Sequence, residues 1–299
     1  MIRVAPAVAA ALADGRPVVA LESTVFSALG LPAPHGKDAL RRCLAAVREA
    51  GAEPAVTAVL DGEARVGLEE HEHDRILGCS RKVAERDLPV AVGGRWACGV
   101  TTVSASLRLA ATAGIAVFAT GGIGGVHRDA SASGDVSADL GALAAHPVVT
   151  VSAGAKAFLD LPRTLEHLEM LGVPVLGLGT SDFPAFTTRS SGLPVPHRVD
   201  TVAEVADVVA AMRGLGYGGG LLLAVPVAEA DEVPKAVLDD AIARAHADAA
   251  AAGVAGPGVT PFVLGRIAEA TDGRSIPANL SLAEGNARVA GQLASLLAG

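Results

Sequence analysis

Residues 115–151 read IAVFATGGIGGVHRDASASGDVSADLGALAAHPVVTV and contain two apolar runs separated by a glycine-rich segment and a helical segment. The runs Ile115–Ala119 and Val148–Val151 have the length and composition of buried strands. Between them, Ser137–Ala145 has helical periodicity, and Ser137 stands where a helix-capping residue is expected. A strand, a helix and a second strand in this order are typical of α/β folds.

Apolar runs and helical segments alternate in the same way over most of the chain. Further strands are predicted at Pro17–Leu21, Pro54–Leu60, Leu88–Val92, Val173–Leu178 and Leu221–Val225. Helices are predicted at Ala39–Glu49, Val103–Ala113 and Thr201–Arg213, the last with Thr201 and Glu204 as a capping box. The Asp61-Gly62 pair is a hairpin signal, so we expect part of the sheet to be antiparallel.

The pattern changes after Asp231. Helical segments then follow one another at Val233–Ala251, Pro261–Ala270 and Leu280–Leu297, and no Pro/Ser-rich linker separates them from the rest. We therefore predict a single domain over residues 1–299. Its expected architecture is a three-layer α/β/α fold with a mainly parallel mixed sheet and a helical C-terminal portion.

The composition argues against several classes of protein. A net charge of −8 disfavours a nucleic-acid surface, which normally carries an excess of basic residues. Gly, Pro or charge interrupts every apolar stretch before it reaches membrane-spanning length. The three cysteines, Cys43, Cys79 and Cys98, include no Cys-x-x-Cys pair, which predicts neither a disulfide framework nor a structural zinc site. We expect a cytoplasmic protein without nucleic-acid or membrane partners.

Lysine is rare in this chain and therefore informative. Only four of the 24 cations are Lys, and the rest are Arg, which does not lose its proton in practice. Lys156 lies among Gly and Ala directly after the predicted strand Val148–Val151. A partly buried amine in such a place can attack a sugar carbonyl carbon, whereas the alternative for Lys156 is a solvated surface charge. Lys82 is either a surface charge or a point charge for a phosphate group.

Acidic and glycine-rich segments follow the predicted strands, where open α/β sheets place their sites. Glu22 closes the first long strand. Asp135 and Asp139 are four residues apart, so on a helix they would share a face and hold a divalent cation; the alternative is helix capping by acids. The glycines of 121–125 either form a tight turn or let the backbone approach a ligand, and they match neither Gly-x-Gly-x-x-Gly nor a P-loop.

Many segments, in the same order, resemble the pseudouridine-5'-phosphate glycosidase family. They are Val18–Thr24, Arg86–Pro89, Thr101–Ala105, Thr120–Arg128, Asp135–Leu140, Ser152–Lys156, Leu159–Leu161, Phe183–Phe186, Thr260–Phe262 and the region of Asn279 and Asn286. This resemblance covers most of the chain. It implies reversible cleavage of the C–C bond between ribose 5-phosphate and uracil, aided by a divalent metal, usually Mn²⁺, in a homotrimer.

The resemblance also implies roles for single residues. Glu22 becomes the proton donor, Lys156 the covalent nucleophile and Asp135 the metal ligand. The implied substrate-binding residues are Lys82, Val103, His127, Ser137, Ala138, Asp139 and Asn286. A C-glycoside has no leaving oxygen for an acid to protonate, so the implied intermediate is a ring-opened lysine adduct of the Schiff-base type.

The chain departs from the family pattern in three places where the base is expected. Ser27–Pro32 is one residue longer than the family's Ser-His-Gly-Met-Pro and lacks its His. The Asn-Pro-Ile-Pro turn is replaced by Val225–Ala228, and Gly285-Asn286 keeps one amide of a pair. We therefore expect a more apolar base pocket. The alternative function is a C-glycosynthase that joins ribose 5-phosphate to a different acceptor, such as an aromatic one.

Overall fold

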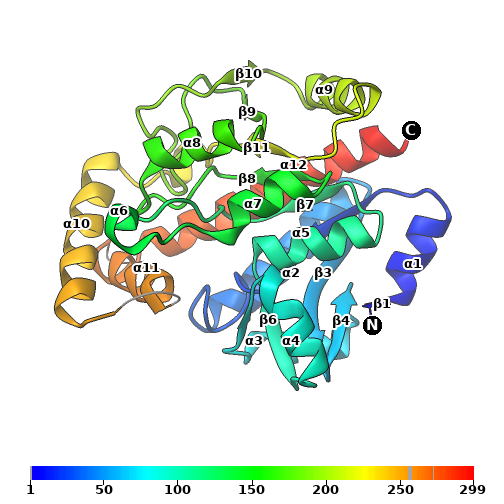
Figure 1. Cartoon of the computed structure of the whole chain (residues 1–299), viewed down its shortest axis with the longest axis horizontal. Helices are drawn as coiled ribbons and strands as arrows, with labels where there is room; N and C mark the ends of the chain where they lie inside the picture. The colour runs from blue at the N-terminus through cyan, green and yellow to red at the C-terminus, as the bar shows by residue number, and fades with distance from the viewer. Residues whose placement is uncertain (1, 255–257, 272) are drawn as a thin grey trace.

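The computed structural model describes residues 2–254, 258–271 and 273–299, and its strands form one mixed sheet between layers of helices (Figure 1). The strands are β1 (Ile2–Val4), β2 (Val18–Leu21), β3 (Glu53–Leu60), β4 (Glu63–Val66), β5 (Lys82–Val83), β6 (Cys98–Thr101), β7 (Val117–Ala119), β8 (Val149–Ser152), β9 (Val175–Leu178), β10 (His197–Val199) and β11 (Leu221–Ala224). The α-helices are α1 (Pro6–Ala13), α2 (His35–Glu49), α3 (His73–Leu77), α4 (Leu88–Gly93), α5 (Val103–Thr112), α6 (Ala130–Ser133), α7 (Ala138–Ala145), α8 (Leu161–Met170), α9 (Val202–Gly214), α10 (Lys235–Ala251), α11 (Val259–Ala270) and α12 (Ser275–Ala298).

The sheet is parallel through its centre and antiparallel near one edge. Its order is β1-β4-β3-β2-β7-β8-β11-β9-β10, with β6 beside the second half of β3 and β5 beside β6. Among its named strands, β3 pairs antiparallel with β4 and with β6. In the parallel centre, Leu21 pairs with Ala119, and Ala119 pairs with Val151. The carboxyl ends of β2, β7 and β8 therefore lie side by side, which is where such sheets place their sites.

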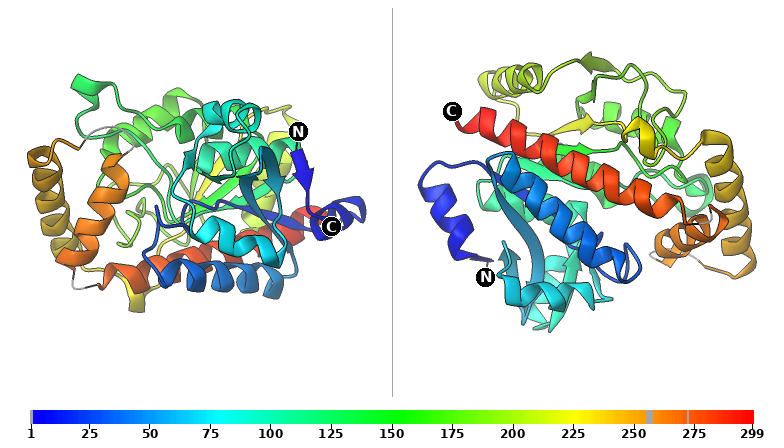
Figure 2. Two further views of the ribbon diagram at one scale, coloured as in Figure 1. Left: turned by 90° about the horizontal axis from the view of Figure 1, so that it is seen from below. Right: turned by 180° about the vertical axis from the view of Figure 1, so that it is seen from behind.

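Helices cover both faces of the sheet. On one face, α1, α5, α7 and α8 pack over inward residues such as Ala20, Phe118 and Leu222. The other face carries α2, α9 and α12, which pack over Val19, Val117 and Leu223. Figure 2 shows α12 and α2 side by side on this second face. The alternation of residues between the two clusters is the period of two expected of strands buried on both faces.

The predicted architecture is confirmed: a three-layer fold with a mainly parallel sheet and a C-terminal portion made of α10, α11 and α12. The Asp61-Gly62 hairpin joins β3 to β4, with both residues at positive φ as a tight hairpin turn requires. The strand predicted at Leu88–Val92 is wrong, because these residues form α4. Pro89 lies in the first turn of that helix, and a short apolar run cannot be assigned by periodicity alone.

The cysteine prediction is also wrong, because Cys79 and Cys98 form a disulfide with their Cα atoms 6.2 Å apart. Nineteen residues separate them in sequence, but Cys79 precedes β5 and Cys98 begins β6, and these two strands pair in parallel. Strand pairing therefore brings the sulfurs together. Sequence spacing carries no signal for such a contact.

Candidate active site

Glu22 is a buried acid at the carboxyl end of β2. It follows Leu21 directly, and only 7% of its surface is exposed. The neighbouring strand β7 ends at Ala119, so Thr120 lies beside it and donates its hydroxyl hydrogen to Glu22 Oε1. Burial raises the pKa of Glu22, while the positive charge of Lys156 and the Thr120 hydroxyl partly oppose this rise. A carboxyl group in this state can keep its proton and donate it to a substrate.

Lys156 is positioned by the glycine-rich segment that follows β7. Its backbone N–H donates to Ile123 O at 3.1 Å, and Ile123 N–H donates in turn to Gly154 O at 3.0 Å. Gly154 has φ 73°, and a Cβ there would lie 2.1 Å from Pro184 O, so a side chain is excluded. The two segments thus extend the parallel sheet beyond β7 and β8. This extension brings Lys156 to the same edge as Glu22.

Asp139 joins three segments around the site. Its carboxylate accepts hydrogen bonds from Gly124 N–H at 2.9 Å and from Ser104 N–H at 3.0 Å. Ser137 Oγ accepts from Asp139 N–H at 3.2 Å and caps α7 as predicted. A Cβ on Gly124 would lie 2.3 Å from Ser137 Oγ, so this glycine permits a close approach. The buried Asp139 therefore fixes the glycine-rich segment against the start of α5.

Lys82 contributes a second amine near Lys156. It begins β5, which lies beside β6 at the edge of the sheet. Its side chain remains accessible to solvent, but the protein atoms around the amine and the charge of Lys156 lower its pKa. Asp139 and Glu22 oppose this shift, so the four groups lie close enough to influence one another. We call Glu22, Lys82, Thr120, Asp139 and Lys156 the catalytic cluster.

Asp135 is placed differently from the sequence prediction. We expected it to share a helix face with Asp139, but α7 begins only at Ala138, so this prediction is wrong. Ser137 caps the helix in an extended conformation, which leaves Asp135 in an extended segment before it. There Asp135 O accepts from His127 N–H at 3.0 Å, and its Oδ2 lies 3.9 Å from His127 Nδ1.

The other predicted site residues surround this cluster in different ways. Val103 begins α5 and is buried in the core. Ala138 is an exposed residue in the first turn of α7. Asn286, on α12, is buried and donates through Nδ2 to Thr120 O at 2.8 Å and to Gly121 O at 3.2 Å. Asn286 therefore supports the glycine-rich segment from behind.

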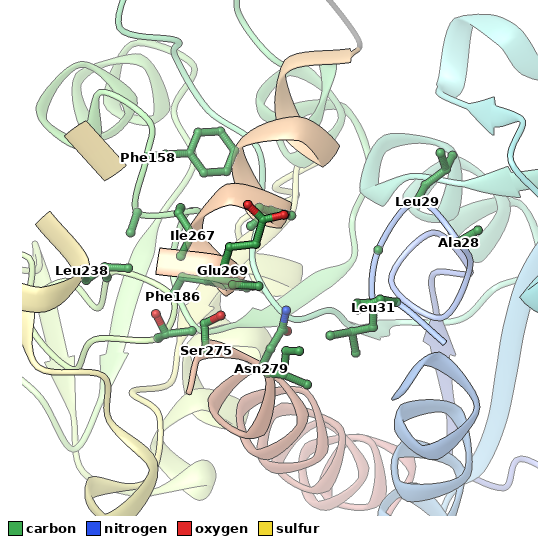
Figure 3. Close-up of a pocket in the computed structure, with 18 residues that line it drawn as sticks. Ala28, Leu29, Leu31, Phe158, Phe186, Leu238, Ile267, Glu269, Ser275 and Asn279 are labelled. Atoms are coloured by element: carbon green, nitrogen blue, oxygen red, sulfur yellow. The ribbon is translucent and has the colours of Figure 1, made fainter. Parts of the chain in front are cut away.

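A cavity of about 380 Å³ is lined by residues that include Ala157, which follows Lys156, and by Phe158, Phe186 and Asn279 (Figure 3). It extends from the loop of residues 28–32 to Phe158, Leu238 and Ile267, and we call it the aglycone cavity. Residues of the predicted departure at 27–32 line it, whereas Val225–Ala228 and Gly285 do not. Its wall is largely apolar.

Two cavity residues lie against the glycine-rich segment. A Cβ on Gly122 would lie 2.6 Å from Phe186 Cδ2, and one on Gly121 would lie 3.6 Å from Asn279 Oδ1. Phe186 has φ 59°, a costly backbone conformation for a bulky residue, and its N–H donates to Ala153 O at 2.9 Å. Within the described part of the chain no donor reaches the buried Asn279 Oδ1. An unpaired buried acceptor beside a cavity can bind a ligand.

Sequence reasoning did not single out Thr120, Phe186 or Asn279, although all three lie in segments that it had marked. A polar residue at the end of the strand next to Glu22 was the available signal for Thr120. The sequence does not distinguish Asn279 from Asn286, whereas the structure shows that no donor among the described residues reaches Asn279 Oδ1 and that Asn286 Nδ2 donates to Thr120 O.

Over residues 2–254, 258–271 and 273–299, no group of three or more His, Cys, Asp and Glu side chains is arranged to bind a metal ion. None of the helices in these ranges combines the length and apolarity needed to cross a bilayer.

The chain is similar to proteins of a known family. A family model described as indigoidine synthase A like protein matches residues 7–296. A pseudouridine-5'-phosphate glycosidase of Methylobacterium nodulans is 50% identical over 298 residues, which cover 99% of this chain and 88% of the relative. One of Myxococcus xanthus is 49% identical over 296 residues, with 98% and 97% covered.

Solved structures agree in fold. The prealnumycin C-glycosynthase AlnA in complex with ribulose 5-phosphate has a TM-score of 0.91 and 36% identity, covering 100% of this chain and 97% of that one. An indigoidine synthase A like protein of Thermotoga maritima has a TM-score of 0.90 and 35% identity, with the same coverage.

Proposed function

The chain belongs to the indigoidine synthase A like family, together with the pseudouridine-5'-phosphate glycosidases that it matches, and on this premise we propose that it cleaves the C–C bond of pseudouridine 5'-phosphate. The products are uracil and ribose 5-phosphate, and the reaction is reversible. One observation carries the proposal. A buried acid with a raised pKa, Glu22, lies at the same sheet edge as Lys156, whose charge is the strongest opposing influence on it.

The reaction begins with opening of the ribose ring. Glu22 donates its proton to the ring oxygen as the C1'–O bond breaks, and Lys156 Nζ forms a bond to C1'. The nitrogen lone pair then forms a C1'=N bond, and the C1'–C bond to the base breaks with its electrons leaving to the base carbon, which takes up a proton. Water adds to C1' of this Schiff base, releasing the aldehyde of ribose 5-phosphate and the free amine.

The sugar phosphate and the base would be bound by different parts of the site, the catalytic cluster and the aglycone cavity. Lys82, whose side chain is accessible to solvent, would bind the sugar phosphate as a point charge. The base would lie in the aglycone cavity, where Phe186 can contact its face and Asn279 Oδ1 can accept one of its N–H groups. In this proposal the base carbon would lie next to the carbon bound to Lys156.

Asp135 fits a divalent cation that binds together with the substrate. Its carboxylate is partly exposed, and divalent cations such as Mg²⁺ or Mn²⁺ are often held by one or two carboxylates plus water and substrate phosphate oxygens. When bound, the cation would neutralise phosphate charge. A homotrimer and a cytoplasmic location remain further predictions.

Covalent trapping tests the proposal directly. The protein is incubated with ribose 5-phosphate and borohydride, and the modified peptide is identified by mass spectrometry. We expect the reduced adduct on Lys156, loss of trapping in Lys156→Ala, and release of uracil from pseudouridine 5'-phosphate by the unchanged protein only. An adduct on Lys82 with Lys156 unmodified, or near-normal uracil release by Lys156→Ala, would contradict it.

A further inference from the structure

Three hydrogen bonds shape the turn that follows Lys156. Lys156 N–H donates to Ile123 O at 3.1 Å, and Leu159 N–H donates to Lys156 O at 3.1 Å. The third bond comes from the C-terminal helical portion, where His246 Nε2 on α10 lies 3.0 Å from Phe158 O. Because a carbonyl oxygen can only accept, Nε2 is the ring nitrogen that carries the hydrogen.

Phe158 O depends on His246 for its hydrogen bond. No other donor among the residues that the structure describes reaches this oxygen. Only 2% of the surface of Phe158 is exposed, and its ring centroid lies 6.3 Å from that of His246 and 6.3 Å from that of His127. Burial lowers the pKa of His246, and the hydrogen bond to Phe158 opposes this shift, so a neutral ring with a single N–H makes the contact at neutral pH.

The same turn serves both parts of the site. Lys156 begins it, and Phe158 lines the aglycone cavity (Figure 3). If the hydrogen bond from His246 is lost, a carbonyl group of a buried residue is left without a partner, and the turn can shift toward solvent or toward another donor. A displacement of about 1 Å of a reacting group can lower a rate by about 10²-fold. The position of Lys156 is therefore sensitive to a side chain on α10.

We propose that His246 is a positioning residue for the reaction: by binding Phe158 O, it fixes the turn so that Lys156 Nζ lies within reach of C1' of the substrate. It acts through the backbone of the turn and transfers no proton. This inference rests on the proposed function, because it assumes that Lys156 forms the covalent adduct. It adds a role in catalysis for α10, a helix that otherwise contributes Leu238 to the wall of the aglycone cavity.

Two variants separate the hydrogen bond of His246 from its ring. His246→Gln keeps an N–H donor on a side chain of similar length, whereas His246→Phe keeps a flat ring and loses the donor. In His246→Phe we expect kcat for uracil release to fall about 10–100-fold, while KM stays within about twofold. The rate at which ribose 5-phosphate and borohydride modify Lys156 should fall by the same factor. His246→Gln should stay within about threefold of the unchanged protein in both measurements, because its donor can reach the same oxygen.

A matched variant on the same helix controls for a loss of stability. Ile242 lies one helical turn before His246 on α10, belongs to the hydrophobic core and does not line the aglycone cavity. Ile242→Ala removes packing of α10 and should lower the urea midpoint of unfolding, but it leaves the hydrogen bond to Phe158 in place. Its kcat should therefore stay within about twofold of that of the unchanged protein. If His246→Phe does not fold, His246→Ala, which also lacks the donor, takes its place.

The possible outcomes distinguish the positioning role from the proposed function. A loss of kcat in His246→Phe that is absent from His246→Gln and from Ile242→Ala supports the positioning role. An unchanged kcat in His246→Phe, equal losses in His246→Phe and His246→Gln, or an equal loss in Ile242→Ala overturns that role and leaves the proposed function standing. If the unchanged protein neither releases uracil nor forms an adduct at Lys156, the proposed function itself is overturned.

Discussion

The catalytic cluster and the aglycone cavity are held by different interactions. In the cluster, Glu22 and Asp139 are fixed by hydrogen bonds to neighbouring strand ends and backbone N–H groups. In the cavity, Asn279 lies beside a largely apolar wall that comes from three loop segments (residues 28–32, 157–158 and 186–187) and from α10, α11 and α12. In the proposed function, catalysis therefore depends on residues held by the ends of the strands. The choice of aglycone depends on the loops and helices that line the cavity, which can change without disturbing the sheet.

Among the variants that distinguish the catalytic cluster from the aglycone cavity, Glu22→Gln should have the largest effect on activity. Loss of the proton donor should lower kcat/KM for pseudouridine 5'-phosphate by about 10²–10⁴-fold with little change in uracil affinity. In the unchanged enzyme the pKa of Glu22 is raised, so kcat/KM should fall as pH rises through that raised value. This decline should be absent from the residual activity of Glu22→Gln, as measured by the pH dependence of uracil release.

Stability gives an independent check on the same residue. A carboxyl group whose pKa is raised by folding stabilises the protein below its unfolded-state pKa and loses this contribution as pH rises through the folded-state value. The free energy of unfolding of Glu22→Gln, relative to the unchanged protein, should therefore increase with pH. A pH-independent difference between the two proteins would contradict the raised pKa of Glu22.

The two asparagines on α12 provide the next sharpest comparison. Asn286→Ala removes two hydrogen bonds to buried carbonyls of the glycine-rich segment, and should cost about 1–3 kcal/mol in the free energy of unfolding. Asn279→Ala removes an acceptor that has no donor among the described residues, so unfolding should change little. Instead its KM for pseudouridine 5'-phosphate should rise about 2–10-fold, the value of one hydrogen bond.

Urea unfolding and steady-state kinetics on both variants measure these effects. Equal losses of stability in the two variants would show that Asn279 is a structural residue. An unchanged KM in Asn279→Ala would remove it from base binding and leave the apolar contacts to orient the base.

The sequence was sufficient for the parts of the molecule that depend on local pattern. Strands such as Val149–Ser152 and the caps at Ser137 and Thr201 follow from short-range periodicity and side-chain chemistry. Contacts between segments that are distant in the sequence were not predicted, because short-range patterns carry no information about them. The Cys79–Cys98 disulfide, the unpaired amide of Asn279 and the cavity between α11 and residues 28–32 all depend on which distant segments meet.

The smallest expected effect compares two helix caps whose hydrogen bonds have the same length. Ser137 Oγ accepts from Asp139 N–H at 3.2 Å in the catalytic cluster, and Thr201 Oγ1 accepts from Glu204 N–H at 3.2 Å on α9. Ser137→Ala and Thr201→Ala should each cost about 0.5–2 kcal/mol of stability, measured by urea unfolding. Only Ser137→Ala should also raise KM, by about 2–10-fold, because it loosens the helix start that positions Asp139. If both variants raised KM by the same factor, KM would depend on the overall stability of the protein. The position of Asp139 would then have no separate effect on substrate binding.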